Sequence, residues 1–292
     1  MIRMRKDLPA VVNPAWLHDR MAGSGPLALG GESLLIVEVG DQQIDRYHSG
    51  HIPGAIYLDS NDFERAPSWN VLPAAELEQV LLRHSITYNQ SIVLYGQDPL
   101  AIARTVLVLL YAGVEDVRWL DGGIEAWKAG GYELEMGLRM PTPARSFGRP
   151  LPGHPEYIVD ISQVRARLTD PQAVIACVRT WEEYNGQASG YTYIHPRGRI
   201  SGSLWAGEPG FEGRQYPPGD PVGQAGRRCR EIARLWQSRG ITPDKRVIFY
   251  CGTGWRASEA FLYAWLMGWK EIAVYDGGWL EWSADVNNPV EV

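Results

Sequence analysis

The chain has 292 residues, of which 45% are hydrophobic, so it is long enough to form the cores of two ordinary domains. Its net charge of −6, from 28 basic and 34 acidic residues, argues against nucleic acid or an anionic membrane surface as the main partner. No apolar stretch approaches the roughly 18 residues of a membrane span, and no signal-peptide core follows the basic N-terminal residues. We therefore expect a cytoplasmic protein without nucleic-acid or membrane partners.

Only three cysteines are present, at Cys177, Cys229 and Cys251. An odd and small number in a chain of this length does not form a disulfide framework, and it suits a free reactive thiol in a reducing compartment. No C-x-x-C pair or Cys/His cluster has the spacing of a zinc site. We expect neither a metal nor a cofactor.

The first half of the chain alternates apolar runs with helical patterns. Strands are expected at residues 34–39 and 92–95, and the second of these lacks polar alternation, which is typical of a strand buried on both faces. A helix is expected at 75–84. Residues 121–123, Asp-Gly-Gly, are expected to form a strand-to-helix turn, because no phosphate-loop pattern follows them. This order predicts an α/β fold with a parallel sheet covered by helices.

The second half repeats the first. After a Pro-rich linker at 141–156, a shift of 155 positions aligns several segments without a gap: 86–87 with 241–242, 92–95 with 247–250, 121–123 with 276–278, and Trp127 with Trp282. Two segments upstream of these also have counterparts: residues 174–178 resemble residues 34–39, and residues 198–203 resemble residues 50–55. The spacing between the two segments is longer in the second copy, which therefore contains an insertion at about 185–197. A helix is expected at 227–239. We predict a first domain at 1–140 and a second at 157–292.

Cys251 lies directly after the predicted strand at 247–250, at the strand end where parallel sheets bind ligands. The turn that follows, Gly252-Thr253-Gly254, leads into a helix beginning near Trp255 and Arg256. Backbone N–H groups of such a turn and the helix N-terminus stabilise a thiolate or a bound anion. Cys251 is therefore the predicted nucleophile. Its counterpart in the first copy is Gly96 (251 − 155), which predicts a catalytically inactive first domain.

The repeated motifs resemble the tandem-domain rhodanese family, which comprises thiosulfate and 3-mercaptopyruvate sulfurtransferases. The resemblance covers nearly the whole chain and depends on three segments: Gly50-His51-Ile52-Pro53-Gly54-Ala55, Tyr250-Cys251-Gly252-Thr253-Gly254, and Asp276-Gly277-Gly278-Trp279-Leu280-Glu281-Trp282. It implies two tandem rhodanese-like domains, each a parallel sheet flanked by helices on both faces. It also implies an inactive N-terminal domain and a catalytic C-terminal cysteine that holds sulfur as a persulfide.

The predicted reaction moves a sulfane sulfur from thiosulfate to a thiophilic acceptor, such as cyanide or a thiol, through a persulfide on Cys251. Because the donor is a small anion, arginines are candidate donor-binding residues. Arg256 closes the loop, Arg179 follows a predicted strand, and Arg197 lies in the insertion, although each can instead be a surface or ion-paired residue. Gly252, Thr253 and Gly254 are the other candidates for donor binding, and Trp255 is expected to shape the mouth of the pocket.

The neutral loop also resembles the mercaptopyruvate branch of the family, so 3-mercaptopyruvate remains an alternative donor. That branch implies a proton relay, for which Thr253, His51 and Asp41 are the candidates. For His51, a structural role in its own turn is the favoured alternative. Cys177 is predicted to share a face with Arg179, and it is expected to be either a small buried residue or a partner that resolves the Cys251 persulfide.

Two more distant functions remain open. The first is a persulfide carrier for a partner protein, suggested by the acidic pair Glu182-Glu183 and the inserted segment at 186–193. The second is a cysteine-dependent phosphatase or arsenate reductase. That chemistry needs five residues between cysteine and arginine, whereas Cys251 and Arg256 enclose four.

Overall fold

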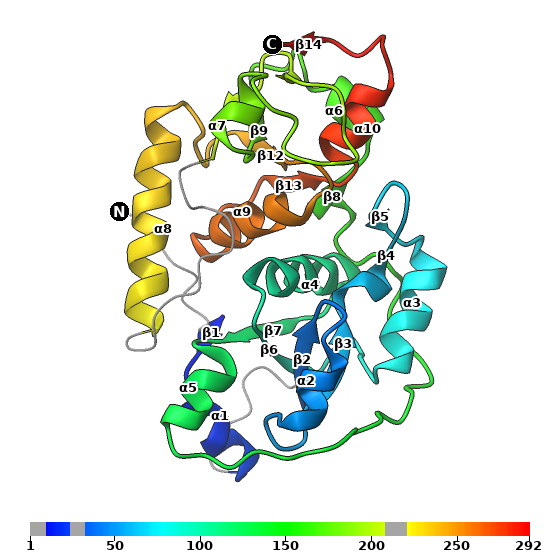
Figure 1. The fold of residues 1–292 in the computed structure, drawn as a ribbon, viewed down its shortest axis with the longest axis vertical. Coiled ribbons are helices and arrows are strands. Elements are labelled where there is room, and N and C mark those ends of the chain that lie inside the picture. Colours follow the sequence, from blue (N-terminus) through cyan, green and yellow to red (C-terminus); the bar gives the residue numbers. More distant parts are fainter. Residues whose placement is uncertain (1–9, 24–32, 208–220) are drawn as a thin grey trace.

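The computed structural model describes residues 10–23, 33–207 and 221–292, with side chains in the last range from 227 onward. Two α/β domains are stacked along the long axis of the molecule, the first below the second in the view of Figure 1. Each contains one five-stranded sheet in which all neighbouring strands are parallel. The predicted α/β fold with two parallel sheets is confirmed.

The sheet of the first domain has the order β1-β7-β6-β2-β3. Its strands are β1 (Val11–Val12), β2 (Leu34–Gly40), β3 (Ile56–Asp59), β6 (Ser91–Gly96) and β7 (Asp116–Leu120), and a short hairpin of β4 (Glu64–Arg65) and β5 (Asn70–Val71) stands apart from it. The helices are α1 (Pro14–Met21), α2 (Ile44–Ser49), α3 (Ala74–Arg83), α4 (Pro99–Ala112) and α5 (Gly123–Ala129), with a 3₁₀ turn, η2, at Ser60–Phe63.

The second sheet has the equivalent order β11-β9-β12-β13-β8. Its strands are β8 (Ile158–Val159), β9 (Ala173–Cys177), β11 (Leu204–Trp205), β12 (Arg246–Tyr250) and β13 (Ile272–Tyr275), and β10 (Arg199–Ile200) pairs with β14 (Val290–Glu291). The helices are α6 (Ile161–Arg165), α7 (Trp181–Tyr184), α8 (Pro221–Ser238), α9 (Trp255–Leu266) and α10 (Gly278–Ala284), after a 3₁₀ turn, η3, at Pro155–Tyr157.

The central strands β6 and β12 are buried because helices cover both faces of each sheet. Along β12 the side chains alternate between two core clusters: Val247 and Phe249 belong to the cluster shared with α4 and α9, and Ile248 and Tyr250 to the cluster beneath α10. Cys251 continues this alternation and belongs to the first cluster. Cys251 therefore lies on the face of the second sheet that is turned toward the first domain.

The segment predicted as the linker packs on the first domain. Phe147 is fully buried, its carbonyl accepts the Tyr88 N–H at 3.1 Å, and the Arg149 guanidinium lies 4.0 Å from the centre of the Tyr88 ring. In Figure 1 the chain from α5 winds under and around the first domain before it reaches β8. This path lets the two halves face each other without a mobile spacer between them.

The two domains meet through α4 and α9, which face each other across the middle of the molecule (Figure 1). Both helices are apolar around most of their circumference, and nearly all their residues are buried. A helix that is hydrophobic on all sides needs cover on all sides. Here each helix packs on its own sheet with one face and on the other helix with the opposite face, so a continuous core joins the domains.

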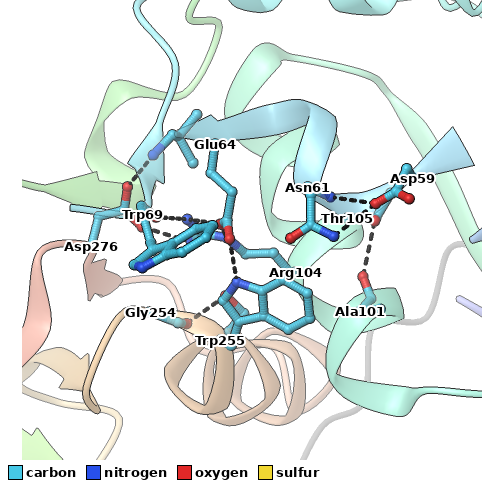
Figure 2. Close-up of polar contacts among 12 residues, drawn as sticks. Asp59, Asn61, Glu64, Trp69, Ala101, Arg104, Thr105, Gly254, Trp255 and Asp276 are labelled. Atoms are coloured by element: carbon cyan, nitrogen blue, oxygen red, sulfur yellow. Dashed lines mark hydrogen bonds and ion pairs between the residues drawn. The ribbon is translucent and has the colours of Figure 1, made fainter. Parts of the chain in front are cut away.

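A buried ionic cluster completes this interface (Figure 2). Arg104, on α4, is fully buried and donates to Glu64 at 3.0 Å and to Asp276 at 2.6 Å. Asp276 follows β13 in the second domain, and its other oxygen accepts the Val71 N–H at 2.6 Å. The Trp255 Nε1 donates to Glu64 at 2.7 Å. One guanidinium thus joins both domains to the start of α9.

Substitution of Arg104 by Met should lower the free energy of unfolding by about 3–5 kcal/mol, because it leaves the Glu64 and Asp276 carboxylates buried without their counter-ion. Urea denaturation followed by tryptophan fluorescence measures this. The matched control is Arg65→Met, which breaks an ion pair to Glu76 that is about half exposed. That control should change stability by less than about 1 kcal/mol. Equal effects of the two substitutions would contradict a structural role for the cluster.

Candidate active site

The loop after β12 is fixed by the first turns of two helices. The carbonyl oxygens of Cys251 and Gly252 accept the N–H groups of Trp279 and Leu280, on α10, at 2.8 and 3.0 Å. The Gly254 carbonyl accepts both the backbone N–H and the hydroxyl of Ser258, on α9. These bonds from α9 and α10 satisfy the carbonyl groups of Cys251, Gly252 and Gly254. The N-terminus of α9 follows this loop directly, and the positive end of its helix dipole favours negative charge there.

At Gly254 the loop packs against the ionic cluster around Arg104. It has φ +91°, a conformation that suits glycine, and an added Cβ would lie 2.9 Å from Asp276 Oδ1 and 3.0 Å from Arg104 Nη1. Figure 2 shows Gly254 and Trp255 next to this cluster. The shape of the Cys251 loop therefore depends in part on Arg104 of the first domain.

Above the loop, Tyr191 and Arg256 form a hydrogen-bonded lid. The Tyr191 hydroxyl accepts the Gly252 N–H at 3.1 Å and is also hydrogen-bonded by Arg256. Arg256 donates two further bonds to the Glu183 carboxylate, both at 2.8 Å. Burial, together with the negative charge of a Cys251 thiolate, raises the pKa of Tyr191, so the phenol is neutral and remains a proton donor at the loop.

A cleft of about 540 Å³ opens between the domains at this loop. Both domains line it. The first domain contributes Asp41, Asn61, Glu64, Trp69 and Leu100, and the second contributes Thr180, Glu183, Ala188, Gly190, Tyr191, Tyr193, Thr253, Trp255 and Arg256. Cys251 itself is only 1% exposed. The cleft is large enough for a small organic molecule as well as for an anion, and Thr253 of the Cys251 loop is one of its lining residues.

The three candidate arginines have different positions. Arg256 lines the cleft, but its guanidinium is paired with Glu183. Arg179 is fully buried on the opposite face of the sheet, where it donates to the Cys177 sulfur at 3.3 Å and to the Gly198 carbonyl at 2.6 Å. Arg197 is exposed and does not line the cleft. The structure brings only one of the three to the cleft.

The proposed relay is not brought together. Asp41 lines the cleft and accepts a hydrogen bond from Asn61 Nδ2 at 2.7 Å. His51 is fully buried inside the first domain, where its ring stacks on Tyr47 at 3.9 Å and its Nδ1 lies 2.9 Å from the Tyr47 carbonyl. These contacts are those of a structural histidine. Thr253, the third candidate, lies in the loop and lines the cleft.

The other two cysteines are buried away from Cys251. Cys177 pairs with Tyr250 in register and belongs to the core cluster beneath α10, whereas Cys251 belongs to the cluster on the opposite face of the sheet. The sheet therefore separates the two sulfur atoms. Cys229 is a buried residue of α8, and burial raises the pKa of its thiol to about 11. Neither position favours a reaction with the Cys251 sulfur.

Over the residues with described positions, no group of three or more His, Cys, Asp or Glu side chains is arranged to hold a metal ion. Within the same ranges, no helix is both long enough and apolar enough to cross a bilayer.

The sequence analysis did not identify Glu64, Trp69, Arg104, Tyr191 or Tyr193 as site residues. Glu183 was noted only as part of an acidic pair. Tyr191 and Tyr193 lie in the inserted segment of the second copy, and this insertion next to the repeated core was the one available signal. The first-domain residues come to the cleft through the packing of α4 on α9, which the sequence pattern does not encode.

Two tandem α/β domains, with a cysteine loop at the carboxyl edge of only the second sheet, define a class of duplicated α/β proteins. The rhodanese-like domain family matches this chain twice, at residues 13–130 and 160–285. The chain therefore belongs to the rhodanese family, as the repeated motifs predicted.

Similarity to individual relatives extends over nearly the whole chain. Thiosulfate sulfurtransferase YnjE of Escherichia coli (strain K12) is 40% identical over 96% of this chain, which spans 64% of that longer protein. A thiosulfate sulfurtransferase of Pseudomonas aeruginosa is 30% identical, with 98% of each chain covered. Both relatives are named as thiosulfate sulfurtransferases.

A solved structure is also similar. The anaerobic ergothioneine biosynthesis enzyme of Chlorobium limicola, in complex with its natural substrate trimethyl histidine, superposes with a TM-score of 0.88. It is 34% identical, and the alignment covers 98% of this chain and 71% of the other. The chain is thus similar both to proteins named as thiosulfate sulfurtransferases and to one named for ergothioneine biosynthesis.

The Glu183–Arg256 pair leads to a prediction about acid stability. Burial alone would raise the pKa of Glu183, but the hydrogen bonds and charge of Arg256 hold it below 4.5. Its stabilising contribution is therefore complete above pH 4.5 and is lost as the pH falls through the lowered pKa. Glu183→Gln should reduce stability at pH 7 and flatten the decline below pH 4.5, as measured by urea denaturation across pH.

The exposed neighbour Glu182 provides the matched control for this measurement. Glu182→Gln should keep the pH profile of the unmodified chain. If Glu183→Gln and Glu182→Gln gave the same profile, the acid sensitivity would not originate in the Arg256 pair.

Proposed function

We propose that this chain is a thiosulfate sulfurtransferase in which Cys251 is the nucleophile. The observation that supports this most directly is the position of Cys251 at the end of a buried strand. It lies in a loop whose carbonyl groups accept hydrogen bonds from N–H groups of α10. The N-terminus of α9, which follows this loop, favours a thiolate and then a persulfide anion on Cys251. The names of two relatives that align over nearly the whole chain support thiosulfate as the donor.

In the proposed reaction, the Cys251 thiolate attacks the outer sulfur of thiosulfate. A new S–S bond forms on Cys251, the sulfur–sulfur bond of thiosulfate breaks, and its electron pair leaves with sulfite. An acceptor such as cyanide or a thiol then attacks the terminal sulfur, and the Cys251 thiolate is the leaving group. Cyanide becomes thiocyanate, and a thiol becomes a persulfide after loss of its proton. No external oxidant is required.

We propose that the first domain has no nucleophile of its own. Gly96, the counterpart of Cys251, has no side chain, and a Cβ added there would lie 2.3 Å from the Val39 carbonyl oxygen. A cysteine would not fit this turn without a shift of β2. The domain instead contributes the wall of the cleft. We also propose a cytoplasmic location, which the free, buried thiols of all three cysteines support.

Cys251→Ser should abolish thiocyanate formation from thiosulfate and cyanide, because a hydroxyl neither forms nor releases a persulfide. The unmodified chain should show ping-pong kinetics and a mass increase of one sulfur on the peptide that contains Cys251. Cys229→Ala removes another buried thiol and should retain activity. Substantial turnover by Cys251→Ser would refute the assignment of the nucleophile.

The same assay with 3-mercaptopyruvate compares the two donors. A kcat/KM that strongly favours 3-mercaptopyruvate would replace thiosulfate in this proposal. Hydrolysis of an aryl phosphate by the chain would instead favour a phosphatase, and turnover only with a persulfide supplied by a protein would favour a carrier.

A second candidate function is sulfur transfer to the imidazole of trimethyl histidine, the substrate named for the Chlorobium limicola enzyme. The observation that favours it is the set of hydrogen-bonding groups beside Cys251. Thr253, Tyr191 and Glu183 all line the cleft and can bind the two nitrogens of an imidazole. In that reaction the terminal sulfur of the persulfide bonds to a ring carbon, the carbon loses its proton, and the Cys251 thiolate leaves.

Incubation with a polysulfide and trimethyl histidine tests the second candidate. Liquid chromatography and mass spectrometry should detect ergothioneine, and Tyr191→Phe should reduce its formation at least about tenfold, because it removes a neutral phenol that is hydrogen-bonded to the loop at Gly252. Turnover of cyanide without any ergothioneine would exclude this acceptor and leave the thiosulfate reaction intact.

A further inference from the structure

The charge of the cleft does not suit a second anionic substrate. Among the described residues that line it, Arg256 is the one with a positive side chain, and Asp41, Glu64 and Glu183 are acidic. Arg256 and Glu183 form a two-bond ion pair, so these two charges cancel within the wall of the cleft. The negative charge that remains comes from the first domain.

Two carboxylates of the first domain line the cleft, and positive charges do not fully neutralise them. Glu64 shares the single guanidinium of Arg104 with Asp276, so this cluster has two negative groups and one positive group. Burial raises the pKa of Glu64, and Arg104 opposes that rise. Asp41 accepts a hydrogen bond from the neutral amide of Asn61, at 2.7 Å. Over the residues that the structure describes, Asp41 forms no ion pair, so it contributes negative charge to the cleft.

Aromatic side chains line the same cleft as these carboxylates. Trp69 from the first domain and Trp255 and Tyr193 from the second line the same cleft. The Trp255 ring is held by its bond from Nε1 to Glu64 at 2.7 Å, and the Trp69 carbonyl accepts a bond from Arg104 at 3.2 Å. Figure 2 shows both tryptophans gathered around the Glu64 carboxylate. A cation over such a ring gains about 0.5–2 kcal/mol.

We propose that Asp41, Glu64, Trp69 and Trp255 form a subsite for an ammonium group, and that it selects sulfur acceptors with a positive charge near the reacting atom. We call this set the cation subsite. The inference rests on the proposed persulfide chemistry of Cys251 and adds the charge class of the acceptor. The cleft volume of about 540 Å³ leaves room for such an acceptor beside the loop.

The reaction at this subsite is the second half of the transfer already described. The thiolate of a cationic thiol attacks the terminal sulfur of the Cys251 persulfide, the new S–S bond forms on the acceptor, and the Cys251 thiolate is released. The ammonium group takes no part in the bond changes. It lowers the energy of the bound acceptor and of the transition state by its interaction with Asp41 and the indole faces.

Three thiols of similar size test the charge preference: cysteamine is cationic, 2-mercaptoethanol is neutral and mercaptoacetate is anionic. With thiosulfate saturating, we expect kcat/KM to decrease in that order after correction for the uncatalysed rates. Asp41→Asn should lower the ratio of cysteamine to 2-mercaptoethanol by about five- to tenfold, the size expected for one charge-assisted contact. The ratio cancels any general loss of activity in the variant.

The matched control is Asp45→Asn, which makes the same change of charge on α2, at an exposed position outside the cleft. It should leave the acceptor ratio unchanged. An equal ratio in the unmodified chain, Asp41→Asn and Asp45→Asn would overturn the cation subsite. Continued thiocyanate formation in that case would show that the proposed function itself stands.

A binding measurement that needs no turnover separates the two proposals further. Saturation-transfer NMR compares choline with its neutral isostere 3,3-dimethylbutan-1-ol. Choline should bind more tightly, and both Asp41→Asn and Trp69→Leu should weaken it, whereas Trp69→Phe should retain the aromatic face and the binding. Equal binding of the two compounds to the unmodified chain would refute the subsite, even if sulfur transfer to cyanide is absent.

Discussion

The arrangement of the active site depends on one buried guanidinium. Arg104 extends from α4 of the first domain to Glu64 and Asp276, and it lies against the backbone of Gly254 in the catalytic loop. A buried charge of this kind tolerates little movement, because separation from either carboxylate exposes a large desolvation cost. The two domains, the loop and the first turn of α9 are therefore held in a single arrangement, and the apolar packing of α4 on α9 excludes water from it.

This constraint gives the two domains different roles in one site. The second domain provides the sulfur atom, the loop N–H groups and the Tyr191 hydroxyl, whereas the first provides Asp41, Glu64 and Trp69 along the opposite wall of the cleft. Arg256, which the sequence suggested as a donor-binding cation, is instead paired with Glu183 and helps to fix Tyr191. The electrostatic character of the cleft is thus set largely by the domain without the cysteine.

The local sequence predicts the fold of each domain well, but it predicts the packing of one domain against the other poorly. The apolar run at 92–95 and its repeat at 247–250 became β6 and β12, and the helices expected at 75–84 and 227–239 became α3 and the C-terminal part of α8. Cys251 was placed correctly at the edge of the sheet, because strand-to-helix turns leave a clear pattern of glycines. The sequence alone did not distinguish Arg179 and Arg197 from residues that line the cleft. The burial and orientation of an arginine side chain depend on its contacts with residues that are distant in the sequence. For the same reason Arg104 resembled an ordinary helical residue.

The backbone at Gly96 limits which side chains the first domain can hold at the position equivalent to Cys251. The Val39 carbonyl oxygen lies 2.3 Å from where a Cβ would be, so a substitution to cysteine alone does not produce a second copy of the Cys251 loop. Such a loop would also require a movement of β2. An engineered protein with a thiol in each domain therefore needs coordinated changes in two neighbouring strands.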